Sequence, residues 1–333
     1  MPILPSWKEW PEGRVRRAEL RRLYASGYQG AYHADGERDD LVDGFAFPTF
    51  ADAADEYDLR SFDGNAGGLY LPFLSVLELE PAAYDGAQET GDCVSWWAQR
   101  HADSVRATDI LDRAEPESWR AEGATEPIYG WRETRRAGMS CARAVDYLTS
   151  SGGVILRQLY ESGDLTSYNP ALAIKWGRRQ GTPDGINQAG RAHQIKQATC
   201  VEDLESMRVA FRCGYSVGGC SGLGLSARRD ANGVSEPAGS WAHAMWWGGY
   251  DERRETIDAI GEPVVLVVNS WGAWNRGPRR ILGTSVDIPR GACWVRESVI
   301  ERRCLHGGGC YTFSGADGWP ALYLPNLGAT GEV

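Results

Sequence analysis

Lysine is scarce in this chain of 333 residues and occurs only at Lys8, Lys175 and Lys196. Acidic residues outnumber basic ones, 45 to 35, which gives a formal net charge of −10. Binding to the phosphates of nucleic acids needs a concentrated positive surface, so this balance excludes nucleic acid as an expected partner. The shortage of lysine beside many arginines is typical of a coding bias, and we draw nothing about function from it.

Long apolar runs are also missing. No stretch approaches the roughly 18–20 apolar residues that a membrane-spanning helix needs. The first seven residues, MPILPSW, lack the basic start and the apolar centre of a signal peptide. We therefore expect no membrane partner and a cytoplasmic location.

The eight cysteines do not suggest a disulfide scaffold, because the chain is too long to depend on one. We expect most of them to be reduced. Cys304, His306 and Cys310 offer three possible zinc ligands, but their spacing matches no four-ligand pattern. The glycine-rich stretch at 218–224 lacks the Lys-Ser/Thr of a phosphate loop. The sequence therefore predicts neither a metal nor a cofactor.

The stretch at residues 88–105, QETGDCVSWWAQRHADSV, contains the cysteine most suited to chemistry. Apolar residues after Cys93 recur at helical spacing, so Cys93 lies at or next to the first turn of a helix. Backbone N–H groups and the helix dipole favour a thiolate there. An isolated cysteine at such a position is more often a packed core residue, so the interpretation depends on partners elsewhere.

Two later stretches supply such partners. Residues 239–250 are typical of a strand that ends in a Gly-Gly turn, with His243 near its start. The apolar, β-branched run at 264–268 is typical of a buried strand, and it leads directly into Asn269. Cys93, His243 and Asn269 therefore form, in chain order, a set of nucleophile, base and orienting group.

These stretches resemble the sequence boxes of the papain-like cysteine peptidase family, in the same order and over residues 88 to about 299. The matching boxes are Gln88 with Gly91-Asp92-Cys93, His243-Ala244 with Gly249-Tyr250, and Asn269-Ser270-Trp271-Gly272. The last box, following a His-Ala strand, is the most specific of the three.

The resemblance implies an α+β fold of two lobes, a helical lobe and a β-sheet lobe with the active-site cleft between them. The papain-like domain would span residues 85–300, with the helical lobe at about 85–200 and the β-rich lobe at about 201–300. Residues 1–84 would be an N-terminal extension, acting as a docking arm or as a prosegment. Residues 301–333 would form a C-terminal arm.

The resemblance also assigns roles to residues. Cys93 would be the nucleophile, His243 the general acid and base, and Asn269 the residue that orients the imidazole. The Gln88 amide and the Cys93 backbone N–H would bind the oxyanion, and Trp271 would shield the contact between His243 and Asn269 from water.

Several features depart from the family pattern. Gln88 stands five residues before Cys93, one fewer than is usual in the family, and the second cysteine that cathepsin-type enzymes carry before the nucleophile is missing, which indicates a divergent bacterial or phage-type branch. Asp92 stands directly before the nucleophile, where a carboxylate opposes a thiolate unless it faces solvent or an arginine. Gly138-Met139-Ser140 replaces the Gly-Gly that pairs with the substrate backbone in the family. We expect residues 251–262 to form a long hairpin loop, and the polar stretch at 109–131 to be an exposed excursion.

The sequence therefore predicts a cysteine endopeptidase that acts on polypeptides. An acyltransferase or amidase with the same triad would differ only in its acceptor. The alternative from another class is a catalytically silent papain-fold structural or interaction protein. A phage virion or tail component that assembles with a protein partner through its terminal extensions is one example, and its location would be the virion.

Overall fold

The computed structural model describes residues 47–61, 67–112, 118–132, 137–177, 181–305 and 309–322. Residues 1–46 of the expected N-terminal extension and residues 323–333 of the expected C-terminal arm lie outside the described residues, as does His306. The proposed domain boundaries and the processing of the N-terminal extension therefore stay predictions.

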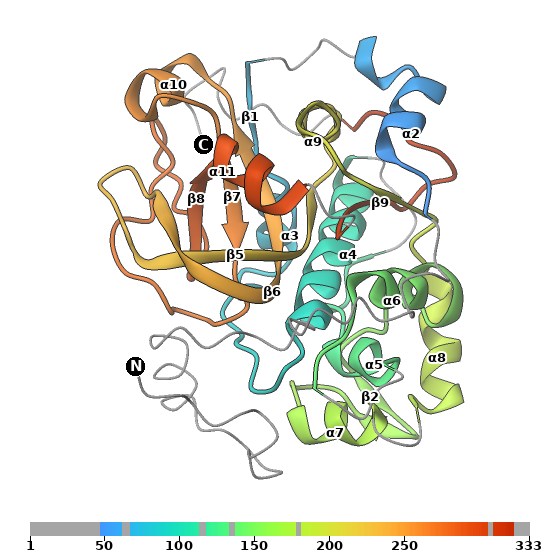
Figure 1. Cartoon of the computed structure of the whole chain (residues 1–333). Coiled ribbons are helices and arrows are strands. Elements are labelled where there is room, and N and C mark those ends of the chain that lie inside the picture. Colours follow the sequence, from blue (N-terminus) through green and yellow to red (C-terminus); the bar gives the residue numbers. More distant parts are fainter. Residues whose placement is uncertain are drawn as a thin grey trace.

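Two lobes are visible in Figure 1, a sheet-rich lobe and a group of short helices, with one long helix between them. The helices are α2 (Phe50–Glu56), α3 (Pro72–Leu79), α4 (Cys93–Asp112), α5 (Thr125–Gly130), α6 (Cys141–Asp146), α7 (Pro170–Lys175), α8 (Asp184–Gly190), α9 (Leu204–Arg212), α10 (Arg254–Ile260) and α11 (Glu297–Ile300). Single helical turns are η2 (Leu59–Ser61), η3 (Tyr147–Ser151), η5 (Arg191–His193) and η6 (Glu301–Leu305). None of the helices in the described part of the chain combines the length and the apolar character that crossing a bilayer requires.

The strands of the larger lobe form one sheet, which has seven strands within the described residues. Its order is β4-β9-β5-β6-β7-β8, and β1 pairs antiparallel with β6. A separate small hairpin consists of β2 and β3. The strands are β1 (Leu69–Tyr70), β2 (Leu159–Tyr160), β3 (Gly163–Asp164), β4 (Gln197–Cys200), β5 (Val217–Arg229), β6 (Ser235–Asp251), β7 (Val264–Val268), β8 (Ala292–Arg296) and β9 (Cys310–Ser314).

Strand β7 explains why the run at 264–268 is apolar without alternation. Val264, Leu266 and Val268 belong to the core that also contains Cys93 and the apolar residues of α4. Val265 and Val267 lie in a second core on the other side of the sheet. Because successive side chains point to opposite faces, a strand covered on both faces must be apolar throughout. The prediction of a buried strand is confirmed.

Helix α4 is the central element and confirms the helix predicted from Cys93. It runs for 20 residues, and every side chain from Cys93 to Thr108 is buried. It packs against α3 and α5 and against β6 and β5 of the sheet, so it is in contact with both lobes. A helix that is covered on all sides in this way holds its first residue, Cys93, in a fixed place relative to the sheet.

A disulfide joins Cys141, at the start of α6, to Cys220 on β5, and so links the helical lobe to the sheet. The other six cysteines are free thiols, so most are reduced as predicted. The pair itself could not be predicted, because 79 residues separate its members in the sequence.

Two predictions about loops are wrong. Residues 109–131 are not simply an exposed excursion, because α4 continues to Asp112 and α5 is buried along its whole length. Residues 251–262 are not simply a hairpin loop, because they contain α10. This helix ends at Ile260 and is capped by Gly261 in the left-handed conformation that glycine favours.

Candidate active site

Cys93 occupies the first position of α4. The carbonyl oxygen of Asp92 accepts from Ser95 N at 2.9 Å and from Trp96 N at 3.2 Å, which closes the first turn of the helix around the cysteine. The thiol is fully buried. It is contacted by the backbone N–H groups of Val94 and, from strand β6, of Ala244. The sulfur therefore lies against the main chain immediately after His243.

His243 is held on β6, opposite Ser221 of β5. Its Nε2 lies 2.9 Å from Asn269 Oδ1. An amide oxygen only accepts, so Nε2 carries the proton and donates it to Asn269, and Nδ1 of the neutral ring is the basic nitrogen. Nδ1 is buried, and it has no hydrogen-bond partner among the described residues. The imidazole is thus oriented with one nitrogen on Asn269 and the other available as a base.

Three tryptophans surround this pair. Trp271 lies on the imidazole with 4.5 Å between ring centroids and 36° between planes. Trp241 packs on Trp271 at 4.7 Å, and Trp274 contacts both. Sequence reasoning missed Trp241 and Trp274. Trp241 precedes His243 by two residues on a strand, and this period of two could have identified it as a neighbour on the same face.

Gln88 is fixed to the turn that carries Asn269. Its backbone N donates to Ser270 O at 2.8 Å, and its Oε1 accepts from Ser270 Oγ at 2.5 Å. Its side-chain Nε2 donates to Thr90 O at 2.9 Å. The structure therefore places Gln88 beside the turn that follows β7, five residues before Cys93.

Asp92 does not point to solvent, and it forms no ion pair with an arginine of the described residues. It is completely buried, and its Oδ2 accepts from the hydroxyl of Tyr168 at 2.8 Å. The same hydroxyl accepts from Glu89 N at 3.1 Å. Burial raises the pKa of Asp92 to about 7. Tyr168 lies 76 residues from Asp92 and carries no sequence signal that could have identified it.

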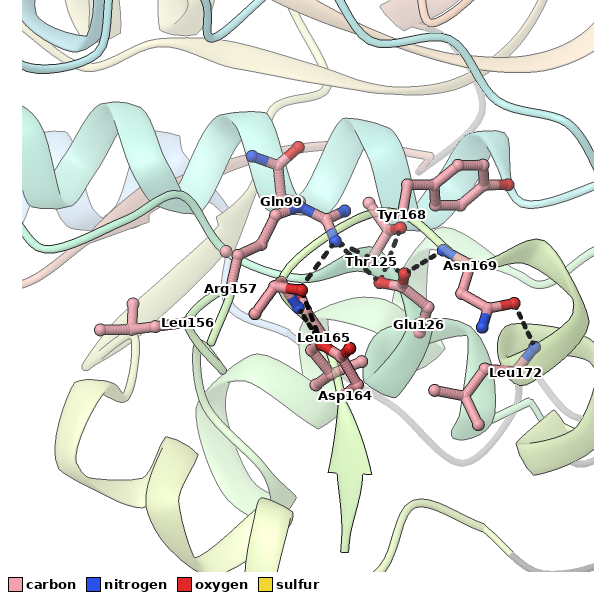
Figure 2. A network of polar contacts seen from close by, with 12 residues as sticks. Gln99, Thr125, Glu126, Leu156, Arg157, Asp164, Leu165, Tyr168, Asn169 and Leu172 are labelled. Atoms are coloured by element: carbon pink, nitrogen blue, oxygen red, sulfur yellow. Dashed lines mark hydrogen bonds and ion pairs between the residues drawn. The ribbon is translucent and has the colours of Figure 1, made fainter. Parts of the chain in front are cut away.

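The segment that carries Tyr168 is anchored by a buried carboxylate, Glu126 of α5 (Figure 2). Glu126 accepts from Asn169 N at 2.6 Å and forms an ion pair with Arg157 at 3.4 Å. Arg157 Nη1 also donates to Leu165 O at 3.5 Å. Because Glu126 is fully buried, these partners are required to satisfy its charge. They keep the loop after β3 in place, and with it the hydroxyl that binds Asp92.

The electrostatics of the closed site favour the neutral forms of the central pair. Burial raises the pKa of Cys93 to about 12, and the charge of Asp92 acts in the same direction. Burial lowers the pKa of His243 to about 4, although its hydrogen bond to Asn269 favours the protonated form. Because both groups are fully buried, the proton remains on the sulfur at neutral pH.

No metal site accompanies this arrangement within the described ranges, where no three His, Cys, Asp or Glu side chains gather closely enough to hold an ion. Cys304 and Cys310 are free thiols, and Cys310 Sγ donates to the Cys304 carbonyl oxygen at 3.5 Å.

The raised pKa of Asp92 gives a prediction for stability. The unfolded chain releases this proton near pH 3.8, whereas the folded chain keeps it until about pH 7. Between these values the folded state binds more protons, so Asp92 makes the free energy of unfolding fall as pH rises from about 4 to 7. We expect the free energy of unfolding of Asp92→Asn to fall less steeply over this pH range than that of the wild type. Urea unfolding of both proteins at several pH values measures the difference between them.

The difference between the two proteins isolates Asp92, because other acids such as the half-buried Glu122, whose pKa burial raises to about 8, are present in both. Tyr168→Phe serves as a control that retains the carboxyl group but removes its hydrogen bond. Parallel stability curves for wild type and Asp92→Asn over this range would contradict the assignment.

Comparison with known proteins gives structural matches alone: no family model matches the chain, and no curated protein matches it. Xylellain, a cysteine protease from Xylella fastidiosa, superposes with a TM-score of 0.50 at 14% identity, over 78% of this chain and 90% of that one. The proform of the ragweed cysteine protease Amb a 11 superposes with a TM-score of 0.48 at 13% identity, over 92% of this chain and 91% of that one. Digestive procathepsin L2 from Tenebrio molitor superposes with a TM-score of 0.45 at 12% identity, over 89% of this chain and 88% of that one.

The match to xylellain shows the fold. The chain has the two-lobed α+β architecture of papain-like proteins, as the sequence predicts. At this level of identity the likeness does not extend to the chemistry, so the function must be argued from the residues themselves.

Proposed function

We propose that this chain is a cysteine peptidase that hydrolyses polypeptides through an acyl-enzyme, with Cys93 as nucleophile and His243 as general acid and base. The observation that carries the proposal is the 2.9 Å contact between His243 Nε2 and Asn269 Oδ1. This contact leaves Nδ1 as the basic nitrogen of His243. The next residue along the strand is Ala244, whose backbone N–H contacts the Cys93 thiol. Nucleophile, base and orienting group are the parts that acyl transfer requires.

The first half of the reaction forms the acyl-enzyme. The Cys93 proton passes to His243 Nδ1 while the sulfur attacks the peptide carbonyl carbon. The carbonyl oxygen becomes an oxyanion, which the Gln88 amide and the Cys93 backbone N–H would bind. When the carbon–nitrogen bond breaks, the proton on His243 leaves with the new amine, and a thioester on Cys93 remains.

The second half uses water. His243 accepts a proton from the attacking water, and the oxyanion forms again at the same position. The carbon–sulfur bond then breaks, the peptide leaves as a carboxylic acid, and His243 returns its proton to the sulfur. Asn269 holds the ring in the same orientation throughout, and Nε2 keeps its proton while Nδ1 accepts and returns one, because Asn269 contacts only Nε2.

The first test is hydrolysis of a mixture of internally quenched fluorogenic peptides. We expect cleavage, and we expect iodoacetamide to lower its rate in proportion to the fraction of Cys93 that is alkylated. Mass spectrometry measures that fraction. Cys200, a partly exposed free thiol, serves as an internal reference for accessibility. Absence of cleavage, with Cys200 alkylated and Cys93 untouched across pH 5 to 9, would contradict the proposal.

A silent papain-fold protein is the second candidate, and one observation favours it. Cys93 and His243 are fully buried, and their pKa values keep both neutral in the closed site. In a peptidase, entry of substrate and water must reverse this desolvation. In a silent protein the site stays closed, and residues 1–84 and 301–333 would serve assembly with a protein partner, for instance in a phage particle.

A further inference from the structure

Arg100 is a buried cation that the proposed reaction does not use. It lies on α4 seven residues after Cys93, which places both on the same side of the helix, about two turns apart. The residue is 2% exposed. Its Nη1 donates to the main-chain oxygen of Asn269 at 2.9 Å. One helix therefore carries both the thiol and a direct contact to the residue that orients His243.

The surroundings of Arg100 do little to compensate its charge. Nε and Nη2 have no hydrogen-bond partner among the described residues. The carboxyl group whose charge acts on Arg100 is Glu122, and no ion pair joins the two in the described part of the chain. The guanidinium lies 5.3 Å from the ring centroid of Trp96 and 5.8 Å from that of Tyr84. Burial lowers the pKa of Arg100 to about 10, so it remains charged at neutral pH. A buried cation without an ion-pair partner destabilises a fold relative to an apolar side chain of similar size.

The contact of Arg100 lies at a turn on which the site depends. Asn269 directly follows β7, where the chain leaves the sheet. The next residue, Ser270, is bound through its carbonyl oxygen by Gln88 N. The two hydrogen bonds hold consecutive carbonyl groups of the turn, one from α4 and one from Gln88. Without the hydrogen bond from Arg100, the main chain of Asn269 is less restrained. The Asn269 side chain, which orients His243, is then less well positioned.

The charge of Arg100 also acts on the imidazole. Among the charged groups that affect His243, Arg100 is the one whose field opposes protonation of the ring. Asp92 acts on the neighbouring thiol and opposes a thiolate. The other groups that contact the ring, Asn269, Trp271 and Trp241, are neutral. The positive charge of Arg100 therefore disfavours a protonated His243 unless the negative charge of a Cys93 thiolate is present at the same time.

We propose that Arg100 is a positioning residue: it ties the main chain of Asn269 to the helix that carries Cys93, and its charge opposes an imidazolium on His243 that is not paired with a thiolate. This inference rests on the proposed peptidase function for its consequence in catalysis. Its electrostatic part concerns the resting protein and does not need a substrate.

Three substitutions separate the hydrogen bond from the charge. Arg100→Gln retains an N–H donor without charge, Arg100→Lys retains the charge on a different donor, and Arg100→Met removes both at similar length. Arg106→Gln is the matched control, because Arg106 is a second buried arginine of α4, bonded to Asp103 at 2.9 Å. Circular dichroism establishes that each variant is folded.

Two measurements are made on each variant. In NMR titrations of histidine-labelled protein, with the His243 signal assigned from His243→Gln, we expect the pKa of His243 to rise in Arg100→Gln and Arg100→Met but not in Arg100→Lys. In peptide hydrolysis, we expect kcat to fall about 100-fold in Arg100→Met with KM nearly unchanged, because misplacement of a reacting group acts on the chemical step. Arg100→Lys should recover part of this loss, and Arg106→Gln should change neither quantity.

The results separate the two proposals. If wild type cleaves no peptide, the proposed function fails, and the NMR titration still decides whether Arg100 acts on His243. If wild type is active and the Arg100 variants lose only thermal stability, with kcat and the pKa of His243 as in Arg106→Gln, Arg100 is a packing residue and the inference is overturned.

Discussion

Replacing Cys93 by alanine is expected to abolish peptide hydrolysis, with a fall in kcat of at least about 10⁴-fold, because no acyl-enzyme can form without the sulfur. His243→Ala is expected to lower kcat by about 10²–10⁴-fold, the usual contribution of a positioned general base. The double variant should be no worse than Cys93→Ala, since residues that act as one unit are not additive. Initial rates with one quenched peptide measure all three.

The matched control is Cys200→Ala. Cys200 is a free thiol on β4, at the end of the sheet order away from β6 and β7, so its loss should leave kcat and KM unchanged. Equal rates in wild type and Cys93→Ala would place the activity elsewhere or in a contaminant. A large loss in Cys200→Ala would indicate that thiol substitutions act through folding.

The part of the site predicted from sequence is the part fixed by local pattern. The apolar period after Cys93 predicts α4, because helical spacing is readable over about three turns, from Val94 to Val105. The unbroken apolar run before Asn269 predicts β7, because only a strand covered on both faces needs one. These two elements, with β6, position the thiol, the imidazole and the amide.

The remainder depends on pairings between distant residues. Glu126 looks like a solvent-facing acid in a polar stretch, and its burial follows from Arg157 and from the main chain at Asn169. Asp92 is likewise satisfied by a hydroxyl 76 residues away. A buried polar residue cannot be told from an exposed one by its own sequence context, because its partner determines whether burial is tolerable.

Gln88→Ala is expected to lower kcat by about 10²–10³-fold, with KM changed far less, because an oxyanion donor binds charge that develops only in the transition state. The Gln88 amide is held in place through Ser270 Oγ and Thr90 O, so the donor is oriented before substrate arrives. Gln88→Glu should be at least as damaging, since a carboxylate there repels the oxyanion. Steady-state kinetics with a single quenched peptide measure each variant.

Two further variants distinguish the oxyanion role of Gln88 from a role in packing. Ser270→Ala retains the amide but removes the hydroxyl that holds its oxygen, and we expect a loss of about tenfold, smaller than that of Gln88→Ala. Gln99→Ala removes another buried glutamine, which donates to Asp103 at 2.5 Å on α4, and should affect stability without affecting kcat. If Gln88→Ala instead raises KM and leaves kcat unchanged, Gln88 contributes to substrate binding and the oxyanion must be bound by the Cys93 backbone N–H together with another donor.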